Sequence, residues 1–82
     1  MAHDILIVDD EEDIRVLTAG ILEDEGYQVR TAADSASALS SIEVRRPNLV
    51  LLDIWLQGSD LDGLGILKEI KKDHINLPVL MM

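Results

Sequence analysis

Apolar segments that could form strands alternate with longer segments of helical periodicity along the whole sequence, and this alternation most constrains the fold. The segments expected to be strands are residues 5–8, 27–31, 49–53 and 78–82. Between them, apolar residues recur at the spacing of one helix face. Because strands that alternate with helices pair in parallel through right-handed crossovers, the sequence predicts an α/β fold.

Capping residues indicate where the helices begin and end. We expect Asp10 to cap the first helix and Asp34 the second, Gly26 to end the first, and Pro47 to stop the second shortly before it. The Arg45-Arg46 pair at the end of the second helix is interpreted as a partner of the helix dipole. The apolar residues of the three helices include Ile14, Leu17, Ile21 and Leu22, then Ala38, Leu39 and Ile42, then Leu64, Leu67 and Ile70.

Acidic residues follow two of the predicted strands directly. Asp9 and Asp10 come after the first strand, and Asp53 ends the third, whose unbroken apolar character predicts burial on both faces. These acids share one crevice if the strand order is 2-1-3-4, with the first helix on one face of the sheet and the second and third on the other. Ligands of such sheets bind at the carboxyl ends of the strands, beside the point where the order reverses.

Three carboxylates at one crevice repel one another. At a separation of about 5 Å and an effective dielectric constant near 20, each charged pair costs about 3 kcal/mol. Either protonation or a bound cation must offset this repulsion. A purely oxygen ligand set favours Mg²⁺ or Mn²⁺ over zinc. Taken singly, Asp9, Asp10 or Asp53 could instead be a helix cap or a solvated loop residue.

Composition narrows the class of protein. The chain has 82 residues, enough for one domain. It has 16 acidic and 7 basic residues and a net charge of −9, which argues against nucleic-acid binding through its own surface. It contains no cysteine, which excludes disulfides and thiolate metal sites. Without a long apolar run or a signal-like start, we expect no membrane span and a cytoplasmic location.

Several motifs together resemble the receiver domain of bacterial two-component response regulators. They are residues 5–11, which read ILIVDDE, residues 49–53, and Asp62-Gly63-Leu64. Residues 21–26 and 53–63 are similar to the nitrogen-regulation branch of that family. The resemblance covers the whole chain and implies a flavodoxin-like (CheY-like) parallel sheet.

The resemblance also implies roles for individual residues. Asp53 would accept a phosphoryl group from a sensor histidine kinase, with Mg²⁺ as cofactor. Asp10 would bind the metal directly, Asp9 largely through water, and Trp55 through its backbone carbonyl. Such a module is a phosphoacceptor in signalling and not an enzyme in its own right.

Two departures from the common receiver pattern stand out. Gln57 occupies the place of a proline, and Asp62-Gly63 lies two residues further on, so the loop after the acceptor is longer. The chain also stops at Met82. We therefore expect residues 1–82 to be a truncated receiver without the fourth helix, fifth strand and fifth helix, impaired in phosphoryl transfer. We also expect a homo-oligomer or domain-swapped dimer, formed through the apolar residues 79–82 of the exposed sheet.

Two other functions stay open from the sequence. One is a metal-dependent phosphohydrolase that forms an aspartyl-phosphate. Such enzymes usually need a second acid two residues after the nucleophile. That position is occupied by Trp55 after Asp53 and by Glu11 after Asp9. The other is a structural or oligomerising fragment with a vestigial site.

Overall fold

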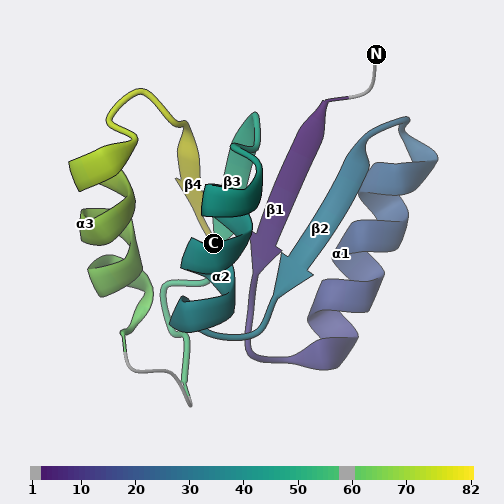
Figure 1. Cartoon of the computed structure of the whole chain (residues 1–82). Helices are drawn as coiled ribbons and strands as arrows, with labels where there is room; N and C mark the ends of the chain where they lie inside the picture. Colours follow the sequence, from purple (N-terminus) through teal and green to yellow (C-terminus); the bar gives the residue numbers. More distant parts are fainter. Residues whose placement is uncertain (1–2, 58–60) are drawn as a thin grey trace.

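The computed structural model describes residues 3–57 and 61–82, in which four strands alternate with three helices (Figure 1). The elements are β1 (Asp4–Val8), α1 (Glu12–Asp24), β2 (Gln28–Ala32), α2 (Ser35–Val44), β3 (Leu49–Leu52), α3 (Gly63–Asp73) and β4 (Val79–Met81). The predicted order of elements is confirmed, with boundaries that differ by one residue at several strand ends. Gly58, Ser59 and Asp60 of the long loop lie outside the described residues.

The four strands form one parallel sheet in the order β2-β1-β3-β4. Ile7 of β1 lies opposite Thr31 of β2 on one side and Leu51 of β3 on the other. The predicted order 2-1-3-4 is therefore confirmed. Because β1 and β3 are neighbours and run in the same direction, their carboxyl ends lie at the same edge of the sheet.

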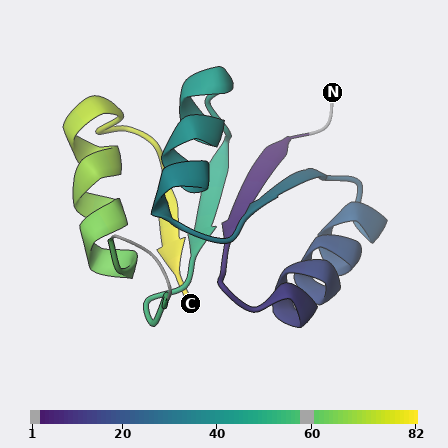
Figure 2. The same ribbon diagram turned by 60° about the horizontal axis from the view of Figure 1, so that its bottom comes forward.

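Helices α2 and α3 cover one face of the sheet, and α1 lies beside β2 on the other (Figures 1 and 2). The main core lies under α2 and α3. Its best-buried members from strands and helices are Leu6, Val8, Val50, Leu52, Ala38, Ile42, Ile66 and Ile70. No helix in the described part of the chain combines the length and the apolar content that crossing a membrane requires.

The face that carries α1 is less covered. Helix α1 has no buried residue, and Leu17 and Ile21 are 62% and 57% exposed. In β3, Val50 and Leu52 are buried, whereas Leu49 and Leu51 are only half-buried. The prediction that β3 is buried on both faces is therefore wrong for the described residues, because α1 contacts mainly β2 and leaves β3 open on this side.

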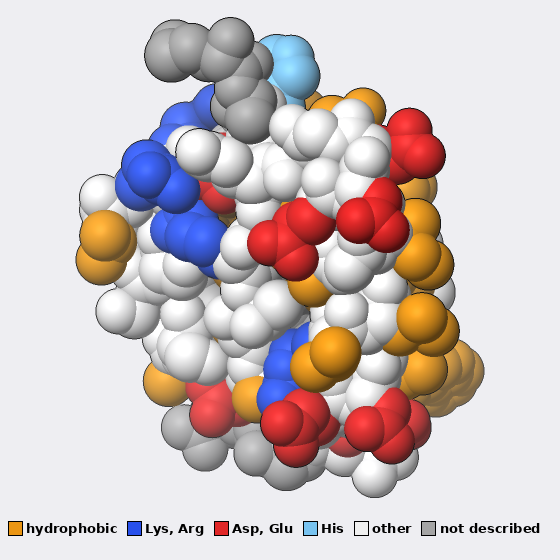
Figure 3. Space-filling view, turned by 90° about the vertical axis from the view of Figure 1, so that its right-hand side faces the viewer, with side chains coloured by type: hydrophobic (Ala, Val, Ile, Leu, Met, Phe, Trp, Pro, Cys, Tyr) orange, Lys and Arg blue, Asp and Glu red, His pale blue; other side chains and the backbone are white. Residues whose placement is uncertain are grey.

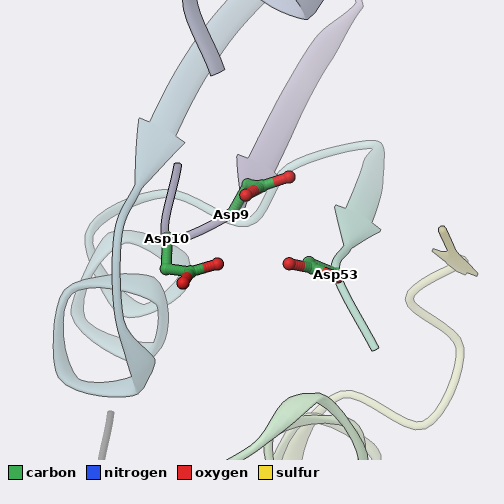
Figure 4. Close-up of side chains that lie close together, drawn as sticks. All are labelled: Asp9, Asp10 and Asp53. Carbon is green, nitrogen blue, oxygen red and sulfur yellow. The ribbon is translucent and has the colours of Figure 1, made fainter. Parts of the chain in front are cut away.

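The beginning of α1 differs from the prediction. The helix starts at Glu12, and its N-cap is Glu11, whose side chain makes no capping hydrogen bond. The N–H of Glu11 donates instead to Oδ1 of Asp9, at 2.9 Å. The prediction that Asp10 is the N-cap is wrong, because the turn after β1 directs the Asp10 carboxylate toward the other acids (Figure 4).

Two other predicted helix boundaries are confirmed. Gly26 follows the last turn of α1 with a φ of 97°, a conformation that favours glycine. Asp34 caps α2, and its Oδ1 accepts the N–H of Ser37 at 2.8 Å. This hydrogen bond, together with that of the Ser37 hydroxyl, lowers the pKa of Asp34 below its ordinary value. The cap thus contributes stability above the ordinary pKa of 3.8 and loses it as the pH falls through the lower folded pKa.

At the amino end of the sheet, Asp4 is paired with two arginines. Its Oδ2 lies 2.9 Å from Nη2 of Arg30 on β2 and 2.9 Å from Nε of Arg45 after α2. Arg30 also donates from Nη1 to the backbone carbonyl of Ser41, at 2.8 Å. Arg45 therefore pairs with the start of β1, in place of the helix-dipole role predicted for it. This network joins β1, β2 and α2.

Candidate functional site

The three predicted acids meet at the carboxyl edge of the sheet. Asp9, Asp10 and Asp53 each offer a carboxylate oxygen, and these oxygens all lie within 4.8 Å of one another. Figure 4 shows that the carboxylates of Asp10 and Asp53 point toward each other, with Asp9 close to both. The structure thus brings together the three side chains that the strand-end pattern singled out.

The sheet itself sets this proximity. Val8 of β1 lies opposite Leu52 of β3, and the N–H of Asp53 donates to the carbonyl of Val8 at 2.9 Å. On the other side, the N–H of Asp9 donates to the carbonyl of Ala32 at 3.1 Å. The hydrogen bonds of the sheet continue past the ends of β1 and β3, so the acids that follow these strands are held side by side.

Backbone N–H groups and one guanidinium hold the acidic segments. Oδ1 of Asp53 accepts the N–H of Trp55 at 2.9 Å, in the same manner as Asp9 accepts that of Glu11. Nη1 of Arg15 donates to the backbone carbonyl of Asp9 at 2.7 Å. Arg15 thereby ties the first turn of α1 to the end of β1. It binds the carbonyl and leaves the Asp9 carboxylate available.

The charge of the acidic cluster is not neutralised by nearby side chains. Among residues 3–57 and 61–82, no Lys, Arg or His nitrogen pairs within 4.0 Å with Asp9, Asp10 or Asp53. Asp9 is only 5% exposed, and the other two are half-buried. At such separations each charged pair costs about 3 kcal/mol at an effective dielectric constant near 20. The cluster is therefore suited to a cation.

The donor set fits a hard divalent cation. All three groups are carboxylates, the ligands that Mg²⁺ takes in small number while it keeps several water molecules. A hollow next to the acids leaves room for those waters. It is lined by Asp9, Asp10, Glu11, Ile14, Asp53, Trp55 and Gln57.

The sequence predicts Trp55 as part of this site, but it does not assign Glu11 or Ile14 to it. Trp55 is expected there, and this residue is 78% exposed and lines the hollow with Asp53. The proposed metal contact of its backbone carbonyl stays a prediction. Glu11 and Ile14 line the hollow because α1 begins immediately after the acids, and Arg15 follows within the same turns. In the sequence, Glu11 stands out only within residues 5–11 and as the acid two residues after Asp9, and Ile14 only as an apolar residue of the first helix.

Comparisons with known proteins agree with this fold. The family model described as "Response regulator receiver domain" matches residues 5–82. The nitrogen assimilation regulatory protein NtrX of Azorhizobium caulinodans is 66% identical over the whole chain, which covers 18% of that protein. The putative NtrX-like response regulator of Rickettsia bellii is 53% identical, over 96% of this chain and 16% of its own length.

Solved structures give the same result. The crystal structure of NtrX from Brucella abortus matches with a TM-score of 0.95 and 67% identity, over 99% of this chain and 19% of that one. The chain thus spans about a fifth of the full-length relatives that it matches. The strand order, the acids at the ends of β1 and β3, and the match over residues 5–82 lead to one conclusion: the chain belongs to the family of response regulator receiver domains.

Proposed function

We propose that Asp53 accepts a phosphoryl group from a sensor histidine kinase. The observation that carries this proposal is the convergence of Asp53 with Asp9 and Asp10 in a chain of the receiver family, where no basic side chain of residues 3–57 and 61–82 pairs with these acids. Asp53 lies at the edge of a hollow, where a phosphoryl group can reach it from solvent. Its backbone is anchored to β1, so the carboxylate is presented in a fixed place.

The transfer needs few groups from this chain. A carboxylate oxygen of Asp53 attacks the phosphorus of a phosphohistidine, and an O–P bond forms as the P–N bond breaks. The electron pair of that bond stays on the imidazole nitrogen of the kinase, which then takes up a proton, and Asp53 becomes an acyl phosphate. The kinase supplies the activated group, so the receiver contributes orientation and electrostatic stabilisation.

We propose Mg²⁺ as the cofactor, held by Asp10, Asp53 and the backbone carbonyl of Trp55, with Asp9 acting through water. When bound, the ion offsets the repulsion between a carboxylate and an incoming phosphoryl anion. The burial of Asp9 and its hydrogen bond to the Glu11 N–H support a fixed, indirect role for it. In this proposal the chain is an acceptor and not an enzyme.

The relatives support a place in regulation. One is named as a nitrogen assimilation regulatory protein, and we infer that this chain is the input module of a similar cytoplasmic regulator. The net charge of −9 argues that this module does not contact nucleic acid itself. Phosphorylation adds negative charge and bulk at Asp53, which can bias a conformational equilibrium elsewhere in a larger protein.

We also infer that a second copy of the chain covers the open face of the sheet. That face carries an apolar hollow lined by His3, Ile5, Leu22, Tyr27, Asn48, Leu49, Leu51 and Leu80. Leu80 is 58% exposed there, and Leu17 and Ile21 of α1 are exposed as well. Figure 3 shows hydrophobic side chains gathered along one edge of the side that carries α1. An apolar surface of this kind favours association.

Light scattering on the purified chain tests this association. We expect a mass above that of a monomer at protein concentrations on the order of tens of micromolar, and a monomer after Leu80→Glu. Val44→Glu is the matched control, because Val44 is 82% exposed but lies at the end of α2, away from the hollow. A wild-type chain that stays monomeric contradicts the inference.

The phosphoacceptor proposal is tested with Mg²⁺ and a small phosphodonor. We expect Mg²⁺ to change the emission of Trp55, which is the one tryptophan of the chain and lines the hollow with Asp53. Acetyl phosphate should then add one phosphoryl group to the chain, detected by intact mass. Asp53→Asn should abolish the adduct. Asp34→Asn, at the N-cap of α2, should leave it intact.

The other outcomes identify the alternatives. A wild-type chain that binds Mg²⁺ but never forms the adduct contradicts the acceptor role. Rapid turnover of an unrelated ester such as p-nitrophenyl phosphate would instead establish a phosphohydrolase. An absence of any response to Mg²⁺ or to the phosphodonor would leave a structural fragment with a vestigial site.

A further inference from the structure

We propose that Gly63 is a positioning residue for the acceptor Asp53. Because Gly63 has no side chain, the start of α3 can lie in direct contact with the backbone of residues 53–54. A Cβ atom at position 63 would clash with the carbonyl oxygen of Asp53 and would lie 2.8 Å from Cα of Ile54. Real Cβ atoms essentially never come so close to a backbone atom. This inference rests on the proposed function of Asp53.

The reason for the glycine is proximity and not an unusual conformation. Among the described glycines, only Gly26 has a positive φ. Gly20 has no neighbour within 4 Å of an added Cβ, and at Gly65 the nearest neighbour is the side-chain Cβ of Leu61, at 3.2 Å. Gly63 therefore differs from these glycines in meeting a backbone that cannot rotate away.

Helix α3 cannot easily withdraw to make room. Gly63 is buried and follows the N-cap Asp62, whose side chain accepts the N–H of Gly65 at 2.8 Å. Further along the helix, Ile66 and Ile70 are buried in the core. A side chain at position 63 would therefore push on the segment after β3 more readily than it would move the helix.

That segment holds the acceptor. The N–H of Asp53 is fixed to the carbonyl of Val8, and Oδ1 of Asp53 accepts the N–H of Trp55. The peptide between Asp53 and Ile54 lies between these two anchors and is the part that Gly63 contacts. Shifting it would turn the Asp53 carboxylate relative to Asp10 and Asp9. The metal affinity should therefore fall, even if the chain stays folded.

The test compares Gly63→Ala with two matched variants. Gly20→Ala makes the same change in a helix with open space around it, and Ile66→Val removes one buried methylene from α3 and leaves Gly63 in place. For each chain, the Mg²⁺ dissociation constant is measured from Trp55 emission, and the stability from the urea midpoint. We expect Gly63→Ala to weaken Mg²⁺ binding by about tenfold or more, as loss of a supporting contact to a metal ligand commonly does. Ile66→Val should lower the urea midpoint but change Mg²⁺ affinity by less than about twofold.

A double variant keeps the test decisive if Gly63→Ala folds poorly. Gly20→Ala should raise the urea midpoint, because alanine favours a helix interior over glycine. We expect Gly20→Ala combined with Gly63→Ala to recover stability but not metal affinity. If affinity returns together with stability, or if Gly63→Ala binds Mg²⁺ as the wild type does, the positioning role is wrong.

The wild-type chain separates this inference from the proposed function. If it binds Mg²⁺ and never forms the phosphoryl adduct, the acceptor role fails, and the metal measurements still decide the role of Gly63. If it does not respond to Mg²⁺ at all, both proposals are overturned.

Discussion

The two ends of β1 both carry acidic residues, but the protein treats them in opposite ways. At the amino end, Asp4 is 7% exposed and pairs with the guanidinium groups of Arg30 and Arg45. At the carboxyl end, Asp9, Asp10 and Asp53 crowd together, and no described basic side chain pairs with their carboxylates. The same chemical group therefore holds the fold at one end and remains available to a cation at the other.

This difference separates an acid that is paired within the fold from acids whose charge is left without a paired basic side chain in the described chain. A buried carboxylate with its countercharges in place contributes to a fixed arrangement, because removing one partner leaves the others uncompensated. A carboxylate cluster without countercharges costs free energy in the absence of a ligand and regains it on binding. An Asp-to-Asn substitution should consequently have opposite effects on stability at the two ends.

The largest effect is expected at the amino end. Asp4→Asn removes the charge that faces Arg30 and Arg45, and we expect the free energy of unfolding to fall by about 2–3 kcal/mol. This is less than for a fully buried pair, because the Arg45 side chain is 58% exposed and solvent screens its share. Urea unfolding monitored by circular dichroism measures the change.

Asp34→Asn is the control for this substitution. It also removes one aspartate charge, but Asn serves as an N-cap about as well as Asp does, so the cap of α2 is kept. A loss of stability that is equal for Asp4→Asn and Asp34→Asn would mean that the arginine network adds nothing specific.

A smaller effect of opposite sign is expected at the carboxyl end. Asp10→Asn removes one of three neighbouring charges, and we expect the free energy of unfolding in metal-free buffer to rise by about 1 kcal/mol, since solvent screens part of the repulsion. The same variant should lose the stabilisation that Mg²⁺ gives the wild type, which grows with the logarithm of the ion concentration. Thermal unfolding with and without Mg²⁺ measures both changes.

If Asp10→Asn destabilised the metal-free chain, the expected opposite effects at the two ends of β1 would be contradicted. That result would mean that the Asp10 carboxylate already makes favourable contacts in the free protein. It would also mean that repulsion among the three carboxylates does not destabilise the protein in the absence of a cation.

The strand order and the position of the acids could be predicted from the sequence because both follow from local patterns. Apolar runs mark the strands, and residues that directly follow neighbouring parallel strands must share an edge. The positions of Asp9 and Asp53 follow from these two patterns alone. Local patterns also predict that Asp34 caps α2 and that Gly26 ends α1, because these roles depend on the few residues around them.

The features that the sequence did not reveal depend on contacts between distant segments. Asp4 meets Arg45 only because α2 ends above the start of β1, and no local pattern connects the two residues. Likewise, Gly63 touches the backbone after β3 because of how α3 packs, although its position in the sequence was noted. The predicted N-cap of α1, Asp10, differs from the observed one, Glu11. The reason is that Asp9 accepts the N–H of Glu11 in the turn and Asp10 points toward the other acids.

The acids at the two ends of β1 also mark how this strand is aligned with its neighbours. Asp4 must reach Arg30 on β2, while Asp9 must follow Val8 at the point where Asp53 follows Leu52. Sliding β1 by one residue would separate Asp4 from its arginines and move Asp9 out of line with Asp53. The register of β1 is therefore favoured by the charge pairs of Asp4, because the strand is apolar and buried on both faces and its hydrophobic pattern does not select one alignment.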